Sequence, residues 1–224
     1  RDAIVKAAQL KSDDLVLEVG PGKGFLTKEL IKNCGEVIAV EIDVRLVKVL
    51  EQLYTTSRNL KIVPGDVRDM DLHSLISENT KYKVVANLPY SISSPILFRL
   101  FNYKWKRAVL MFQEEFANRL VARPGSKVYG RLSVMANHYV DTRKLFKVSK
   151  TAFQPQPKIH SQVVQLVRRK PDYELDDFNT FEEVVRSIFT HRRKKIRNCL
   201  KLNFKDIEVD DLENMDERAE VLKP

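Results

Sequence analysis

The stretch LVLEVGPGKG, residues 15–24, joins a short apolar run to a turn that holds three glycines in five residues. The apolar run is typical of a buried β-strand. Glycine lets a chain turn sharply and lets a ligand approach the main chain closely. Gly20, Gly22 and Gly24 are three of only seven glycines in the chain. A plain turn between a strand and a helix needs one glycine, so this concentration indicates a turn that binds a ligand.

Outward from this turn, short apolar runs alternate with helical patterns. The expected strands are 15–19, 37–40, 60–63, 83–86 and 108–112, and the expected helices are 25–33, 44–54, 94–101 and 114–121. Strands that alternate with helices predict an α/β fold with a doubly wound parallel sheet. Two later runs, 144–148 and 162–167, have no helix between them, so we expect an antiparallel pair at the sheet edge.

The composition changes after Pro171. Two helical patterns, 176–189 and 194–202, precede a tail from 206 to 224 that is acidic and short of core residues. We therefore expect two domains, with the sheet in residues 1–172 and a small helical domain in residues 173–224.

The composition is that of a folded protein with a basic surface. Hydrophobic residues make up 43% and charged residues 31%, and the formal net charge is +9, which favours a polyanion as partner. Cys34 and Cys199 are too few for a disulfide framework or a cysteine zinc site, and the four histidines lack metal-ligand spacing, so no metal site is expected. No apolar run approaches the roughly 18 residues of a membrane span. We expect a monomer in the cytoplasm.

Two carboxylates follow the second and third expected strands. Glu41 can accept hydrogen bonds from both hydroxyls of a ribose, because acceptor-only oxygens match a vicinal diol. This feature does not separate NAD from S-adenosylmethionine, since both contain the adenosine ribose. Asp66 can accept from an adenine amine, although a lone Asp in a turn is more often an Asx cap. Its place in the series after successive strands favours the ligand interpretation.

Asn87-Leu88-Pro89-Tyr90 follows the fourth expected strand. Asn and Pro also favour ordinary turns, but the chemistry of adenine methylation explains the whole set. The exocyclic amine of adenine is a poor nucleophile, and an Asn oxygen with a backbone carbonyl can orient it. Pro89 fixes φ and so helps to aim the Leu88 carbonyl. Tyr90 offers a face on which an extruded base can stack.

The spacing E-x-G-x-G-x-G in residues 18–24 is that of S-adenosylmethionine-dependent methyltransferases. It differs from the dinucleotide fingerprint G-x-G-x-x-G, because Phe25 follows Gly24. With the tetrad at 87–90, the chain resembles the ribosomal RNA adenine dimethyltransferase family of the KsgA type. Two later segments support the resemblance, YGRLSV at 129–134 and FQPQPKIHS at 153–161.

The resemblance implies a class I, Rossmann-like S-adenosylmethionine-dependent methyltransferase sheet with a small helical C-terminal domain. It implies dimethylation of two adjacent adenosines near the 3′ end of small-subunit ribosomal RNA. It also implies that Phe153 stacks on the base opposite Tyr90, and that a G-Q-x-F-L segment, which closes over the cofactor, would precede Arg1. The residues expected to hold the cofactor are Glu18, Gly20, Gly22, Gly24, Glu41, Ile42, Asp66, Val67 and Asn87, and those expected to hold the base are Asn87, Leu88, Pro89, Tyr90 and Phe153.

Two acid-free stretches carry the basic surface. Residues 142–170 hold eight Lys or Arg, and residues 186–201 hold seven. A single charge run is about as often a plain solvated face, but two such runs beside a base site favour binding of the RNA backbone. The residues expected to bind RNA are Arg131, Lys158, Arg192, Arg193, Lys194, Lys195 and Arg197.

Two alternatives remain open. The first is a large-subunit ribosomal RNA methyltransferase of the antibiotic-resistance type, whose tetrad more often reads Asn-Ile-Pro-Tyr. The second is a mainly non-catalytic factor in ribosome assembly, which an intact tetrad disfavours.

Overall fold

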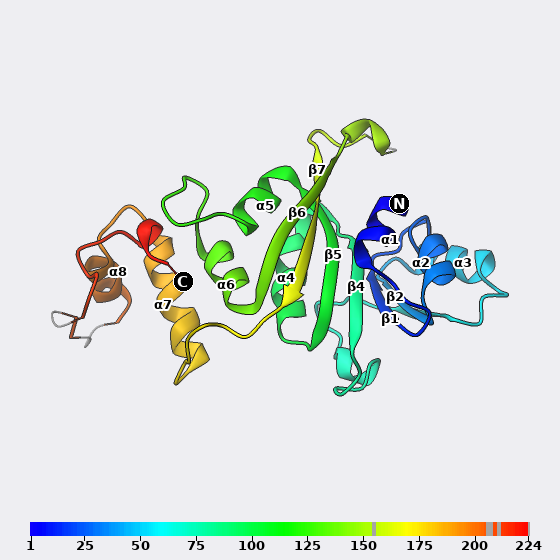
Figure 1. Cartoon of the computed structure of the whole chain (residues 1–224), viewed down its shortest axis with the longest axis horizontal. Coiled ribbons are helices and arrows are strands. Elements are labelled where there is room, and N and C mark those ends of the chain that lie inside the picture. The colour runs from blue at the N-terminus through cyan, green and yellow to red at the C-terminus, as the bar shows by residue number, and fades with distance from the viewer. Residues whose placement is uncertain (154–155, 205–207, 210–211, 224) are drawn as a thin grey trace. The chain divides into compact units, whose positions relative to one another are not determined.

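A computed structural model describes residues 1–153, 156–204, 208–209 and 212–223 (Figure 1). Within these ranges one seven-stranded sheet has the order β3-β2-β1-β4-β5-β7-β6. The strands are β1 (Leu15–Val19), β2 (Glu36–Glu41), β3 (Leu60–Pro64), β4 (Tyr82–Asn87), β5 (Trp105–Gln113), β6 (Val140–Val148) and β7 (Ser161–Arg168). The helices are α1 (Asp2–Ala8), α2 (Thr27–Asn33), α3 (Val44–Leu53), α4 (Ser93–Phe101), α5 (Glu114–Leu120), α6 (Arg131–Tyr139), α7 (Phe178–Thr190) and α8 (Ile196–Asn203). None of the helices in the described ranges is long and apolar enough to cross a membrane.

The pairing of the strands confirms the predicted architecture. β1 pairs with β2 and β4, β2 pairs with β3, and β4 pairs with β5, all in parallel. β7 pairs with β5 in the antiparallel sense. Figure 1 shows β6 beside β7 with the opposite direction, so the predicted antiparallel pair closes one side of the sheet.

The order of the strands fixes where a ligand can bind. The chain builds outward from β1 to β2 and β3, and then returns to place β4 on the other side of β1. In sheets of this kind the crevice lies beyond the carboxyl ends of the strands, where the order reverses. The glycine turn follows β1 and the Asn87–Tyr90 tetrad follows β4, so both face this crevice.

The central strands are buried on both faces. Val16 and Leu17 of β1 and Val84 and Val85 of β4 are fully buried, as expected for parallel strands covered by helices on both sides. Helix α1, which the sequence analysis did not predict, packs on β4 and β5. It buries Ile4, Val5 and Ala8 in the same cluster as Val16, Val85 and Val109.

The chain forms two compact units. The first comprises Arg1–Ala117 and Arg143–Arg168, and the second comprises Asn118–Thr142 and Arg169–Pro224. The expected division after residue 172 did not anticipate that 118–142 group with the C-terminal part. The reason is helix α6, another helix that was not predicted. Its Arg131 forms an ion pair with Glu182 of α7, with 2.7 Å between Nη2 and Oε1.

The second unit has a small core of its own. Ile188 of α7 packs with Ile196, Cys199 and Leu200 of α8. The tail, which was expected to be short of core residues, supplies two to this core, Val209 and Ala219, which are 0% and 1% exposed. Met215 and Leu222 of the tail also pack against this core, and an isolated antiparallel bridge pairs Lys195 with Arg218.

Candidate functional site

The glycine turn after β1 adopts the conformation that the sequence predicts. Gly20, Gly22 and Gly24 have φ angles of +67°, +60° and +75°, a region that residues with a Cβ rarely occupy. The backbone N–H of Gly20 donates to the carbonyl of Val40 over 2.9 Å, which ties the turn to β2. Open space surrounds the position where Gly22 would carry a side chain. A ligand can therefore lie directly against the main chain at this position.

Glu41, the last residue of β2, is held beside the turn. Its Oε2 accepts from the N–H of Gly22 over 2.9 Å, and its Oε1 accepts from the N–H of Asp43 over 3.0 Å. Each carboxylate oxygen has two lone pairs, so each keeps one for a further donor. This leaves capacity for the two hydroxyls of a ribose. Ile42, the next residue, is 59% exposed and leaves an apolar surface uncovered beside the carboxylate.

Glu18 is the most unusual group of the site. Its side chain is 1% exposed, and its Oε2 has no hydrogen-bond partner among the described residues. Burial away from water raises the pKa of Glu18 to about 8; nearby Thr27 lowers it in part, and the charge on Glu41 raises it further. A buried acceptor without a donor is costly unless a ligand supplies the donor.

The titration of Glu18 predicts how stability changes with pH. Folding raises the pKa of this carboxyl. Stability against unfolding is therefore highest, as far as Glu18 is concerned, below the pKa of the unfolded state, and it is lost as the pH rises toward 8. When the pH rises from 6 to 8, we expect the free energy of unfolding of the ligand-free protein to fall by about 2 kcal/mol because of Glu18. Glu18→Gln, which is neutral at all pH values, removes this slope. Urea unfolding of both proteins at several pH values measures it. A variant-minus-wild-type difference that stays flat across this range contradicts the assignment.

Asp66 lies where the sequence predicts, but its carboxylate is already engaged. Oδ1 accepts from the backbone N–H of Arg68 over 2.9 Å, which is an Asx turn, and Oδ2 pairs with the Arg68 guanidinium over 2.5 Å. These bonds lower the pKa of Asp66. A role in adenine binding stays a prediction and requires a free lone pair or a shift of Arg68. Val67 is 4% exposed, so it can reach a ligand only through its main chain.

The tetrad after β4 meets the glycine turn. A Cβ added to Gly20 would lie 3.8 Å from Cδ of Pro89. Asn87 is exposed. The side chain of Leu88 is buried and anchors the backbone of the tetrad. The carbonyl of Pro89 accepts from the hydroxyl of Ser93 over 3.0 Å. The turn and the tetrad therefore form one continuous rim at the carboxyl ends of β1 and β4.

Tyr90 has a partner that the sequence analysis did not predict. Its hydroxyl lies 2.5 Å from Oγ of Ser161, the first residue of β7. Phe153 is half-buried and packs at the edge of the cluster that includes Val109 and Val163. Its stacking opposite Tyr90 stays a prediction. Lys158 is exposed, and Gln154 and Pro155 of the same segment lie outside the described residues.

The expected RNA-binding residues of the second unit are largely paired with acids. Arg192 contacts Glu220 over 2.7 Å, and Asp216 accepts from both Lys195 and Arg197 over 2.9 Å. Arg131 pairs with Glu182, as described above. The acidic tail thus lies against the basic segment that it follows in the sequence.

A hollow of about 410 Å³ opens beside this segment. Four basic residues, Lys127, Arg192, Arg193 and Arg218, contribute to its lining. Arg193 and Lys194 are exposed. The sequence analysis missed Lys127 and Arg218, because neither lies in the two stretches 142–170 and 186–201 and only tertiary folding brings them to Arg192.

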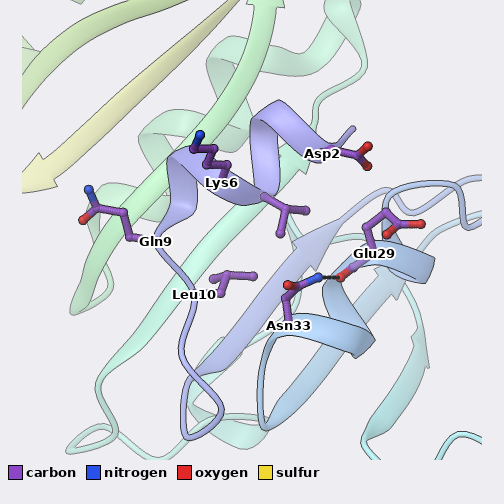
Figure 2. A pocket seen from close by; sticks show the side chains of 7 residues that line it. Asp2, Lys6, Gln9, Leu10, Glu29 and Asn33 are labelled. Atoms are coloured by element: carbon purple, nitrogen blue, oxygen red, sulfur yellow. Dashed lines mark hydrogen bonds between the residues drawn. The ribbon is translucent and has the colours of Figure 1, made fainter.

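A second pocket, of about 360 Å³, lies between α1 and α2 (Figure 2). Figure 2 shows carboxylate, amine and amide groups around it, and Asn33 donates to the carbonyl of Glu29 over 2.7 Å. None of its lining residues belongs to the glycine turn or the tetrad. Its mixed charges indicate no ligand class.

These features define the class of protein. A Rossmann-like methyltransferase has a mainly parallel sheet with one antiparallel strand, a glycine turn after β1, and a carboxylate after β2 that can bind a ribose. This chain has all three. S-adenosylmethionine fits the residues present, because the open main chain at Gly22 can take its nucleoside side. The donor-less oxygen of buried Glu18 suits its positively charged end.

Comparison with known proteins gives the family. The sequence model described as "Ribosomal RNA adenine dimethylase" matches residues 1–223, and the chain belongs to this family. A relative from Methanococcoides burtonii, named "Probable ribosomal RNA small subunit methyltransferase A", is 41% identical over 232 residues, which cover all of this chain and 84% of the relative. A relative of the same name from Methanosarcina acetivorans is 45% identical, over 89% of this chain and 72% of the relative.

Solved structures agree with this assignment. The dimethyladenosine transferase from Plasmodium falciparum superposes with a TM-score of 0.81 at 30% identity, covering 99% of this chain and 90% of that one. The 23S rRNA methyltransferase ErmE superposes with a TM-score of 0.72, also at 30% identity, covering 88% and 79%. The fold class predicted from the sequence is confirmed.

Proposed function

We propose that this protein transfers methyl groups from S-adenosylmethionine to the exocyclic amines of two adjacent adenosines near the 3′ end of small-subunit ribosomal RNA. The single observation that carries the proposal is the meeting of the glycine turn with the tetrad, where Gly20 lies against the ring of Pro89. A cofactor on the turn and an adenine on the tetrad would share one rim. The names of the relatives support the small subunit as substrate.

When bound, S-adenosylmethionine supplies an electrophilic methyl group on a positively charged sulfur. Glu18 would accept a donor from its charged amino-acid end, and Glu41 would accept from the ribose hydroxyls. The exposed side chain of Ile42 would cover one face of the adenine ring. A positively charged ligand end beside Glu18 would favour the ionised form of this carboxyl, whose pKa is raised by burial in the ligand-free protein.

The tetrad would hold the target base. Asn87 Oδ1 and the carbonyl of Leu88 accept hydrogen bonds from the amine and turn its nitrogen lone pair toward the methyl group. Tyr90 and Phe153 stack on the two faces of the ring; each such contact contributes about 1–3 kcal/mol. As the nitrogen–carbon bond forms, the carbon–sulfur bond breaks with its electron pair left on sulfur, and the surplus proton on nitrogen passes to water. Alignment rather than general-base catalysis therefore determines the rate.

The RNA backbone would lie on the basic residues outside this rim. Lys158, on the first unit, and Arg193 and Lys194, on the second, are exposed and ready to contact phosphates. Arg131, Arg192, Lys195 and Arg197 would have to exchange their carboxylate partners for phosphates. We propose a monomer that acts in the cytoplasm.

Methyl transfer from labelled cofactor tests the function directly. We expect label in the RNA of immature small subunits and little in naked large-subunit RNA. Label in the large-subunit RNA alone would establish the antibiotic-resistance type instead. Binding to small subunits without any label would establish the non-catalytic assembly factor and overturn the proposal.

A further inference from the structure

The hydroxyl of Tyr90 is fixed by a residue far away in the sequence. Oη of Tyr90 and Oγ of Ser161 lie 2.5 Å apart, although 71 positions separate them. Ser161 is fully buried, whereas Tyr90 is half-buried and keeps part of its ring accessible. One end of the ring is therefore held inside the protein while the rest remains available to a ligand.

The backbone around Ser161 is rigidly placed. Ser161 stands opposite Gln113 in the antiparallel pairing of β7 with β5. The preceding carbonyl, that of His160, accepts from the N–H of Glu114 over 3.0 Å. Ser161 is therefore anchored to the carboxyl end of β5, and its hydroxyl offers a fixed point to Tyr90.

The other end of Tyr90 is also held. The residue before it, Pro89, has a restricted φ, and its carbonyl accepts from Ser93. A tyrosine ring turns about two side-chain torsions. A hydrogen bond at its far end opposes rotation about the first torsion and so fixes the direction of the ring axis relative to the rim. Since the hydroxyl group of a phenol prefers the plane of its ring, the same bond also favours one orientation of the ring about that axis.

We propose that Ser161 is a positioning residue for methyl transfer, which fixes the place and direction of the Tyr90 ring and through it the position of the stacked adenine. The inference rests on the proposed function. The amine of a stacked base moves with the plane of its platform, and transfer requires the nitrogen within about 3–3.5 Å of the methyl carbon in line with the bond that breaks. Ser161 touches neither the base nor the cofactor in this role.

A double-mutant cycle tests the proposal. The four proteins are wild type, Ser161→Ala, Tyr90→Phe and the double variant, and the measurement is the single-turnover rate at saturating RNA and cofactor. Phenylalanine keeps the stacking face and loses only the hydroxyl. We expect each single variant to lose about tenfold in rate, and the double variant to lose about tenfold rather than a hundredfold, because both changes remove the same hydrogen bond.

The accompanying measurements separate positioning from a merely structural role. We expect the KM for RNA and the Kd for cofactor to stay within twofold of wild type in Ser161→Ala. Ser187→Ala is the matched control, since Ser187 is also buried and its hydroxyl donates to the carbonyl of Cys199 over 3.0 Å. It should lower the melting temperature comparably without changing the rate.

The outcomes are distinguishable. A wild-type protein that transfers no methyl group to any ribosomal RNA refutes the proposed function itself. If the wild type is active and Ser161→Ala keeps the wild-type rate, the inference about Ser161 is wrong while the function stands. Losses that multiply in the double variant, or a raised KM with an unchanged rate, overturn it as well.

Discussion

Replacement of Asn87 by alanine is expected to lower the rate of methyl transfer by about 10²- to 10³-fold, the usual effect of removing one preorganised polar contact to a reacting group. Asn87 is exposed at the end of β4, so the substitution leaves no buried group without a partner. The free energy of unfolding should therefore change little. The loss should appear in the single-turnover rate with small subunits as substrate.

Asn102→Ala is the matched control. Asn102 is also exposed, but it follows α4 and precedes β5, at the opposite edge of the sheet from the tetrad. Its backbone N–H caps α4 by donating to the carbonyls of Arg99 and Leu100, and alanine retains this N–H. A rate within threefold of wild type in Asn87→Ala, or an equal loss in Asn102→Ala, contradicts the role of Asn87.

The second large effect concerns the glycine turn, where two substitutions should act in different ways. A Cβ at Gly24 would stand 2.7 Å from Cδ2 of Leu50 and 2.9 Å from Cε2 of Tyr54, and Leu50 is fully buried. Gly24→Ala adds this overlap to the strain of a positive φ, and we expect a loss of about 3 kcal/mol in stability. Denaturant unfolding measures it.

Gly22→Ala should instead separate binding from folding. Nothing lies within 4 Å of its added methyl group, so only the positive φ opposes it, and stability should fall by about 1 kcal/mol. The methyl group stands where the cofactor approaches the main chain, so the affinity for S-adenosylmethionine should fall at least tenfold. Gly125→Ala is the control, because Gly125 also has a positive φ and open space but lies in the other unit. Equal cofactor affinity in the two variants would refute the proposed approach to the turn.

The strands and the site could be predicted because their signals are local. An apolar run between turn residues defines each strand. The glycine turn, Glu41 and the tetrad could be predicted because each is a short segment at the end of a strand. Helices α1 and α6 escaped prediction because the alternation of strands with helices did not indicate them: α1 precedes the first strand, and α6 follows another helix, α5.

The contacts that the sequence could not predict are tertiary. Ser161 was visible only as the end of a family segment, and its bond to Tyr90 exists because β7 inserts beside β5. The basic run at 192–197 was interpreted as an open RNA surface, whereas the structure pairs three of its side chains with Asp216 and Glu220. Ion pairs between residues that are far apart in the sequence form only when the chain folds.

Mass-spectrometric mapping of N6,N6-dimethyladenosine in ribosomal RNA tests the central claim most directly. Unmethylated small subunits are incubated with S-adenosylmethionine and either the wild-type protein or Asn87→Ala. We predict two adjacent dimethyladenosines near the 3′ end of the small-subunit RNA with the wild type, and about a hundredth of that amount or less with the variant over the same short incubation. No dimethyladenosine with the wild type, or the modification elsewhere in ribosomal RNA, would contradict the account.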